Sequence, residues 1–381
     1  MVDYFNFMKV DFYKHNLSED DKQECVNVLN SLFLTTGEVV KNFENKLAGY
    51  LNLKHAVGVT SCTDALFLSL KCMGIKEGDE VITTPLSFIA TANAVEYCGA
   101  RPIFVEVETG TGNINADLIE KSITERTKAI IVVHLYGQMC DMKKIRAIAD
   151  KYSLKIVEDC AHCIEGEREG VRSGELGDFS CFSFYATKNI TSGEGGAVAC
   201  NNDNDYAWLS RARLHGMSKN AADRYTKKYE HYDMDFLGYK CNMNNISASL
   251  LIHQLDRMED LLARKEVICK QYDIGFGLNN KIKKPAVLEN SKHARHLYTI
   301  WVDPEKRDEY MHQMQDAGIG VAVNFRPIHL MKYYREKYGY KPGDFPIAEK
   351  IGSSTITLPL YPKLTDYEVG FVVSTVNGIV V

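Results

Sequence analysis

The sequence predicts an α/β protein in which a mostly parallel sheet precedes a smaller α+β unit. Three observations support this prediction. The chain has 381 residues, enough to bury a large core and to form about two domains. Short apolar segments alternate with amphipathic ones in the first two thirds of the chain, and a long helical pattern starts at residue 246. We therefore expect a large domain over residues 1–250 and a small C-terminal domain over residues 251–381.

The large domain is expected to start its sheet with a strand at residues 55–60 and a helix from about residue 64. The following strands are expected at 80–84, 102–105, 128–133 and 155–158, with helices at 90–97, 116–122 and 142–152. Such apolar strands are typical of a buried parallel sheet with right-handed crossovers. The small domain is expected to contain a helix over 246–273, a strand at 297–302 and helices at 305–317 and 366–376.

Composition excludes several classes of function. The net charge of −5 argues against a protein built mainly to bind nucleic acid. No apolar run approaches the ~20 residues that span a bilayer, and the N-terminus has no signal pattern, so we expect a cytoplasmic protein without a membrane partner. The polar segment 218–233 is the best candidate for a mobile loop.

The 11 cysteines are scattered, and their odd number does not suggest a disulfide framework. Cys160, His162 and Cys163 would form a partial zinc set. A closed zinc site needs a fourth ligand, and no second C-x-x-C pair occurs in the sequence. We therefore expect no metal.

Lys188 lies between a predicted strand at 181–185 and a glycine-rich turn at 192–196. If this lysine is buried, its pKa falls and the free amine becomes a nucleophile. The alternative is an exposed lysine on a turn, which is the more common case for a lysine considered alone.

Polar and aromatic residues follow several predicted strands, where ligands bind in parallel sheets. Residues 60–65 open a helix and suit a phosphate, although a simple helix cap is the alternative. Phe88 offers an aromatic surface or a core side chain, and Asp159 is an acid that needs a cationic partner if it is buried. Together with Ser183 and Lys188, these are the parts that a pyridoxal phosphate (PLP) enzyme needs.

The sequence resembles the DegT/DnrJ/EryC1/StrS family of sugar aminotransferases over about residues 12–377. The likeness rests on the motifs TSCTDAL, PLSFIATANAV, HLYGQMCDM, VEDCAH, FSFYATKNITSGEGG and LGYKCNMNNISASL, in that order. The resemblance implies a fold-type I PLP-dependent transferase, like aspartate aminotransferase. It also implies that Lys188 binds the cofactor covalently and shuttles protons, that Asp159 pairs with the pyridine nitrogen, and that Phe88 stacks on the ring. It assigns Cys62, Thr63 and Ser183 to the cofactor phosphate and His162 to the neighbourhood of the ring oxygen.

Two segments are similar to the subgroup that makes UDP-4-amino-4-deoxy-L-arabinose: residues 238–243, GYKCNM, and residues 323–329, VNFRPIH. The family likeness implies a homodimer in which the first of these segments reaches the neighbouring subunit's site. We expect Asn242 to contact phosphate in trans, and Lys240, Arg326 and His329 to contact the substrate. A solvated surface residue is the alternative for both Lys240 and Arg326.

The resemblance thus implies transfer of an amino group from L-glutamate to a nucleotide-linked 4-keto sugar. One alternative is a nucleotide-sugar 3-aminotransferase. Another is a related sugar dehydratase, but those enzymes carry His where this chain has Lys188. A third is a non-catalytic regulator on the same fold.

Overall fold

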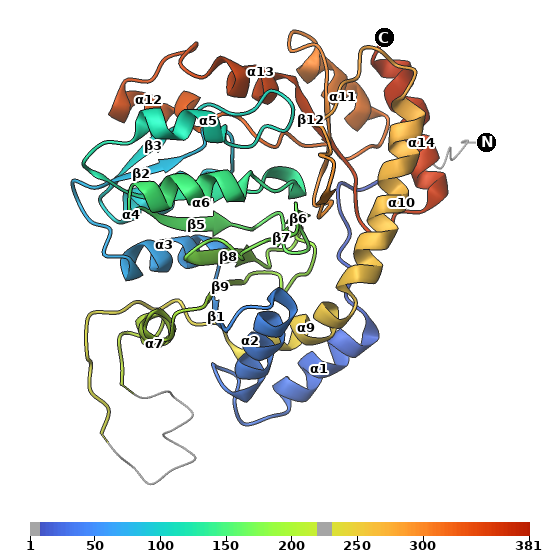
Figure 1. Ribbon diagram of the computed structural model, residues 1–381. Helices are drawn as coiled ribbons and strands as arrows, with labels where there is room; N and C mark the ends of the chain where they lie inside the picture. Colours follow the sequence, from blue (N-terminus) through green and yellow to red (C-terminus); the bar gives the residue numbers. More distant parts are fainter. Residues whose placement is uncertain (1–7, 219–230) are drawn as a thin grey trace.

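The computed structural model describes residues 8–218 and 231–381 (Figure 1). Most of the predicted mobile loop at 218–233 falls on residues 219–230, outside the described residues. Within the described ranges, none of the helices combines the length and the apolar character needed to cross a bilayer.

A seven-stranded sheet forms the centre of the larger part of the chain (Figure 1). Its strands are β1 (His55–Val59), β2 (Glu80–Thr83), β3 (Arg101–Phe104), β4 (Thr127–Val133), β5 (Lys155–Asp159), β8 (Phe179–Ser183) and β9 (Gly196–Cys200), and they lie in the order β1-β9-β8-β5-β4-β2-β3. The run from β8 to β3 is paired in parallel throughout, whereas β9 is antiparallel to both of its neighbours. The prediction of a mostly parallel sheet is confirmed.

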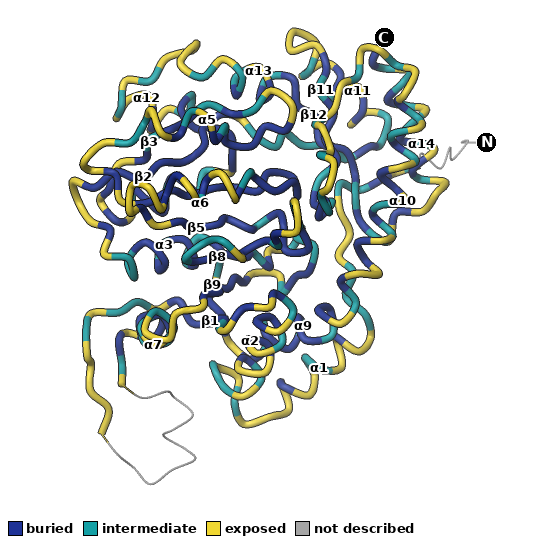
Figure 2. The backbone as a smooth tube through the Cα atoms, in the orientation of Figure 1, coloured by how far each residue is buried: buried dark blue, intermediate teal, exposed yellow. Residues whose placement is uncertain are grey.

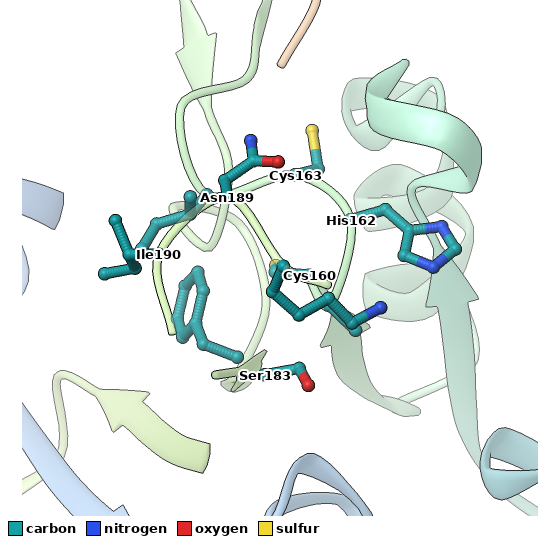
Figure 3. A pocket seen from close by; sticks show the side chains of 10 residues that line it. Cys160, His162, Cys163, Ser183, Asn189 and Ile190 are labelled. Atoms are coloured by element: carbon teal, nitrogen blue, oxygen red, sulfur yellow. The ribbon is translucent and has the colours of Figure 1, made fainter. Parts of the chain in front are cut away.

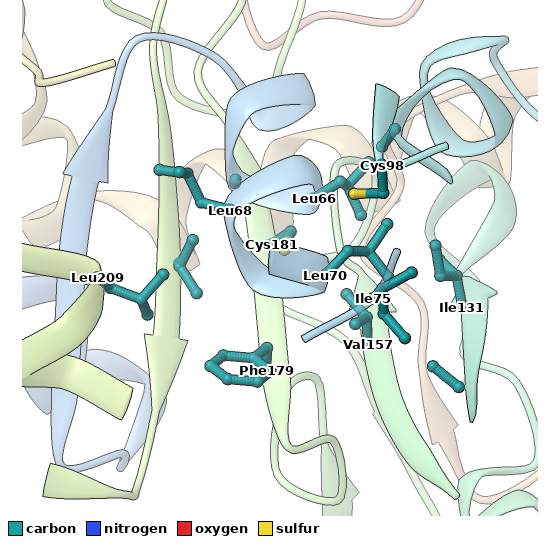
Figure 4. Close-up of a cluster of buried hydrophobic side chains, with 14 of the residues drawn as sticks. Leu66, Leu68, Leu70, Ile75, Cys98, Ile131, Val157, Phe179, Cys181 and Leu209 are labelled. Atoms are coloured by element: carbon teal, nitrogen blue, oxygen red, sulfur yellow. The ribbon is translucent and has the colours of Figure 1, made fainter. Parts of the chain in front are cut away.

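Helices cover both faces of this sheet. They are α2 (Glu38–Leu51), α3 (Cys62–Cys72), α4 (Ala90–Tyr97), α5 (Ala116–Ile119), α6 (Met142–Lys151), α7 (Asp203–Ala212) and α9 (Asn245–Asp256), with 3-10 turns η1 (Glu120–Ser122) and η2 (Leu135–Gly137). A further helix, α1 (Glu19–Leu29), packs on α9. Alternate residues of β4 show the two faces: Ile131 packs in the cluster of α3, α4 and α7, and Ile130 packs in the cluster of α5 and α6. Figure 4 shows Leu66 and Leu70 of α3 close to the strands on the first face. Burial on both faces explains why the strands read as continuous apolar runs, and Figure 2 shows the sheet as the most buried part of the backbone.

The C-terminal part has its own core. It comprises α10 (Met258–Phe276), β10 (Ser291–Lys292), β11 (Tyr298–Trp301), α11 (Arg307–Asp316), η3 (Ile328–Leu330), α12 (Lys332–Tyr338), α13 (Pro346–Ser354), β12 (Thr355–Leu358) and α14 (Asp366–Ile379). The antiparallel pair β11–β12 packs with α10, α11 and α14, and Val10 from the N-terminal segment joins the same cluster. A small sheet connects β10 to β6 (Glu167–Arg168) and β7 (Val171–Arg172) of the larger part. The boundary near residue 250 stays a prediction.

Two predicted elements differ from the structure. The helix expected over 246–273 is two helices, α9 and α10, because the chain bends at Arg257, where φ is −107°. The Arg257 guanidinium bonds the buried carboxylate of Asp21 at 2.7 Å, which holds the bend against α1. The strand expected at 181–185 ends at Ser183, so Lys188 lies in the following loop rather than at the strand end itself.

Candidate active site

Several predicted residues meet at one edge of the sheet. Asp159 ends β5 and Ser183 ends β8, and these two strands are parallel neighbours. Cys62 begins α3 directly after β1. In an open parallel sheet the ligand site lies at the carboxyl ends of the strands, so this edge is the candidate site.

Asp159 is buried without a strong cationic contact. Its carboxylate accepts hydrogen bonds from Thr91 Oγ1 at 2.8 Å and from the Ala161 backbone N–H at 3.2 Å, and Cys62 Sγ lies 3.9 Å away. Only 5% of the residue is exposed, and burial raises its pKa, although these bonds and the charge of Lys188 oppose the effect. A protonated ring nitrogen would supply the partner that a buried carboxylate needs.

Lys188 is held on a short loop beside this acid. Its backbone N–H donates to the Tyr185 carbonyl at 2.9 Å, and the loop is attached to α9 because the Gln254 amide bonds Thr191 N–H at 3.0 Å and Thr191 O at 2.7 Å. The glycine-rich turn follows, with Gly193 at φ +82°. Burial lowers the pKa of Lys188 to about 8, even though Cys62 and Asp159 raise it.

The N-terminus of α3 is the predicted binding site for the phosphate. The helix is capped by Ser61, whose Oγ accepts from Asp64 N–H at 3.1 Å, while the first-turn N–H groups of Cys62 and Thr63 have no intrahelical acceptor. Gly196 lets β9 approach this turn, because a Cβ there would lie 2.3 Å from the Ser61 carbonyl carbon. A phosphate fits such a helix start.

The segment with Lys240 and Asn242 lies near the same corner. Asn242 forms a bridge with Val59 at the end of β1, and its amide nitrogen donates to Thr36 Oγ1 at 2.6 Å. Lys240 Nζ donates to Asn242 Oδ1 at 2.5 Å. Whether Asn242 serves a second subunit stays a prediction.

The pocket around Lys188 contains His162 and Ser183 (Figure 3). His162 is buried, and its Nδ1 accepts from Tyr136 N–H at 3.3 Å. Its pKa falls well below the usual value, first because of burial and then because of Lys188. The His162 ring stacks on the Phe325 ring, with 5.6 Å between the ring centroids. The centroid of Phe325 in turn lies 6.1 Å from that of Phe88. Phe88 is 57% exposed, which leaves a face for stacking.

In the part of the chain that the structure describes, Cys160, His162 and Cys163 do not gather as the partial zinc set that the sequence offers. In Figure 3 the side chains of His162 and Cys163 point in different directions. Among the described residues, His134, Glu158 and Cys160 do come close enough for a metal. However, both ring nitrogens of His134 are engaged, by Glu158 at 2.8 Å and by Cys140 N–H at 3.2 Å. Glu158 also accepts two backbone N–H bonds, from residues 174 and 177. We interpret this group as a buried hydrogen-bond network.

Two predicted substrate contacts lie outside this cluster. Arg326 is exposed on the segment after Phe325. His329 is fully buried, and its Nε2 bonds Glu349 Oε1 at 3.0 Å, so a substrate would reach it only if this part of the chain rearranged.

The sequence reasoning missed residues that support the site. Thr91 was recognisable, because it lies three residues after Phe88 at the start of a helix. His296, which contacts Lys188, lies more than 100 residues further along the chain and belongs to no local pattern. Phe325 lies inside the segment 323–329, but nothing in that segment indicates that its ring packs against His162. These residues show that the site forms between the sheet and the C-terminal part.

The buried acid, the lysine with a lowered pKa, the exposed aromatic ring and the open helix start together fit PLP. Asp159 would face the ring nitrogen, Phe88 and His162 would lie beside the ring, and residues 61–63 with Ser183 would hold the phosphate. The observation that tests this fit most sharply is that the buried Asp159 carboxylate accepts hydrogen bonds but forms no ion pair with any of the described residues.

Known proteins with similar sequences and structures agree with a PLP site. The chain is 40% identical over 370 residues to the spore coat polysaccharide biosynthesis protein SpsC of Bacillus subtilis, covering 96% of this chain and 95% of the relative. It is 35% identical to the GDP-perosamine synthase of Caulobacter vibrioides, covering 94% of each. The PLP form of Spr1654 from Streptococcus pneumoniae, provisionally classed as a sugar aminotransferase, matches with a TM-score of 0.91 and 31% identity over 98% of both chains.

These similarities confirm the predicted fold type I and pyridoxal 5′-phosphate as the cofactor. The model of the DegT/DnrJ/EryC1/StrS aminotransferase family matches residues 15–377. The chain therefore belongs to this family of sugar aminotransferases.

Proposed function

We propose that this protein transfers an amino group from L-glutamate to a nucleotide-linked 4-keto sugar, as a cytoplasmic homodimer. The observation that carries the proposal is Lys188, whose amine lies near a buried acid at the strand ends and has a pKa of about 8. At pH 7.5 this value leaves about a quarter of the amine unprotonated, against about 0.1% for an ordinary lysine with a pKa of 10.5.

The side chains divide the chemistry between them. When bound, PLP supplies an electron sink for the carbanion formed at the amino donor. Lys188 would hold the cofactor through its free amine and, once displaced by the donor, would carry a proton between the donor and the cofactor. Asp159 would keep the ring nitrogen protonated, and Thr91 holds Asp159 in place through the 2.8 Å hydrogen bond from its Oγ1.

A nucleotide-linked substrate is supported by one relative and by local charge. The relative from Caulobacter vibrioides is named for a GDP-linked product, perosamine. Lys240 and Arg326 are exposed, so both are available to a diphosphate, although the protein as a whole carries a net charge of −5. The 4-keto position comes from the subgroup likeness at residues 238–243 and 323–329, and the L-glutamate donor from the likeness to the family as a whole.

A substrate panel tests the proposal. The protein loaded with PLP is incubated with L-glutamate and with UDP-, GDP- or dTDP-linked 4-keto and 3-keto sugars, and the products are analysed by mass spectrometry. We expect amination of a 4-keto sugar, and none with Lys188→Ala. Amination of 3-keto sugars alone would identify a 3-aminotransferase, and loss of a sugar hydroxyl would identify a dehydratase. A protein that binds PLP but converts no donor would be a regulator.

Lys240 provides a test of the nucleotide end. Lys240→Ala should raise KM for the sugar nucleotide by about three- to tenfold and leave the half-reaction with glutamate unchanged, because an exposed charge contributes modestly to binding. Lys121→Ala removes an exposed lysine on η1 and is the matched control. An unchanged KM in the Lys240 variant would remove this residue from the substrate site.

A further inference from the structure

A buried histidine touches the reacting lysine and has no role in the account so far. His296 lies just before β11, is 5% exposed, and places Nε2 3.5 Å from Lys188 Nζ. Its ring centroid lies 4.3 Å from that of His162. His296 therefore borders the same pocket from the C-terminal part of the chain.

Asn189 determines which nitrogen of His296 carries a hydrogen. The Asn189 amide nitrogen donates to the two Glu165 carboxylate oxygens at 2.8 and 2.6 Å and to the Ala294 carbonyl at 2.9 Å. A carbonyl oxygen can only accept, so the amide nitrogen must face this side. Asn189 Oδ1 then faces His296 Nδ1 at 3.3 Å and can only accept from it. His296 Nε2 is left with a lone pair that faces Lys188.

A buried ion pair anchors this arrangement. Glu165 and Lys265 are 4% and 3% exposed, and Lys265 Nζ lies 4.0 Å from Glu165 Oε1. Lys265 belongs to α10 and also donates to the Ala294 carbonyl at 3.3 Å. The hydrogen bonds of Asn189 are thus fixed by two buried acceptors that α10 holds in place.

We propose that His296 is a positioning residue for Lys188. In the tautomer imposed by Asn189, His296 Nε2 accepts a hydrogen bond from the released lysine. The inference rests on the proposed role of Lys188 as the reacting amine. A neutral acceptor beside Nζ favours the ammonium form over the amine. His296 therefore helps Lys188 to keep the proton taken from the donor until that proton is delivered, and the imidazole itself takes no proton.

The charges around both groups are consistent with a neutral His296. Burial lowers the pKa of Lys188, and Cys62 and Asp159 raise it. The titratable groups that act on His296 are Lys188, His162, Lys265 and His293. Burial is the largest effect on His296 and, with these neighbours, takes its pKa well below the usual value. The ring consequently remains an acceptor over the pH range in which Lys188 titrates.

The test measures the titration of Lys188 directly. The full chain is loaded with pyridoxamine phosphate, which has no aldehyde and leaves Lys188 free. The protein is then pulsed with an amine-reactive acylating reagent between about pH 6 and 10, and labelling of the Lys188 peptide is followed by mass spectrometry. We expect His296→Leu to lower the labelling pKa by about one unit, the effect of losing one hydrogen bond to a charged group. His296→Gln, which offers an oxygen acceptor, should restore most of the shift.

His293→Leu is the matched control. His293 is also buried, lies in the same segment, and makes its hydrogen bond with the Arg295 backbone N–H at 3.0 Å rather than with Lys188. Its labelling profile should match the unmodified protein. If folded His296→Leu also matches it, the proposal is overturned.

Asn189→Ala keeps the proposal testable if His296→Leu does not fold. Without the amide, His296 can adopt the other tautomer and turn a hydrogen towards Lys188, so the labelling pKa should also fall. An unshifted profile would contradict the role of Asn189. The labelling requires neither glutamate nor a sugar, so a failure of the proposed substrate would leave this result unchanged.

Discussion

Replacing Asp159 with Asn tests the acid that the cofactor requires. The amide has nearly the same shape, and its oxygen can still accept the hydrogen bond that Thr91 Oγ1 makes at 2.8 Å, so the fold should persist. The negative charge that would face the ring nitrogen is lost. A hydrogen bond to a charged group contributes about 1.5–3 kcal/mol, so we expect PLP to bind about 10- to 150-fold more weakly.

A second consequence concerns Lys188. Asp159 raises the pKa of this lysine by attraction, so the Asn variant should bring it below about 8. Both effects are measured by titrating the cofactor-free protein with PLP at several pH values and following the visible absorbance of the attached cofactor.

Asp178→Asn is the matched control for this substitution. Asp178 directly precedes β8, and its carboxylate likewise accepts a backbone N–H bond, from Ile156 at 2.9 Å. It lies beside the start of β5, at the opposite end from Asp159, and pairs with Lys155. This variant should lose stability and keep its affinity for PLP. Equal PLP affinities of the Asp159 and Asp178 variants, both at the level of the unmodified protein, would refute the reasoning.

Three further predictions follow from the site and its support. The rate of PLP attachment should rise from about pH 7 to 9 as Lys188 loses its proton and then level off, since burial brings its pKa to about 8; a rise only above about pH 10 would contradict this. Gly196→Ala should weaken PLP binding and lower the thermal unfolding midpoint because the new methyl group meets the start of α3, whereas Gly370→Ala, which has open space, should change neither. Glu44→Gln should lower the free energy of unfolding in a urea titration by about 3 kcal/mol, because it leaves the buried Arg213 without its charged partner; a loss below about 1 kcal/mol would show that this pair is not structurally important.

Local patterns in the sequence were sufficient for much of the fold. The helix predicted at 90–97 is α4, and the strands expected at 128–133 and 155–158 match β4 and β5 to within one residue at each end. The bend at Arg257 was not predictable, because its partner Asp21 is more than 230 residues earlier. Helical periodicity continues across the bend, and only the tertiary ion pair shows where the chain turns.

The candidate site likewise contains residues that local patterns place and residues that only long-range packing places. Asp159 and Ser183 are the last residues of β5 and β8, and α3 starts shortly after β1, so strand alternation places all three at one edge. The contact of Lys188 with His296 depends on how the C-terminal part packs on the sheet, which no local pattern encodes. The burial of His329 likewise results from long-range packing against Phe345 and Glu349.

The central claim is that Lys188 is the amine that holds the cofactor and transfers its proton. The most direct measurement is reduction of the PLP-loaded protein with borohydride, followed by proteolysis and mass spectrometry of the peptides. The account predicts a pyridoxyl group on the peptide that contains Lys188, with no label on any other lysine. Labelling of Lys265, the buried lysine that lines the adjoining pocket, with Lys188 unmodified, would contradict it.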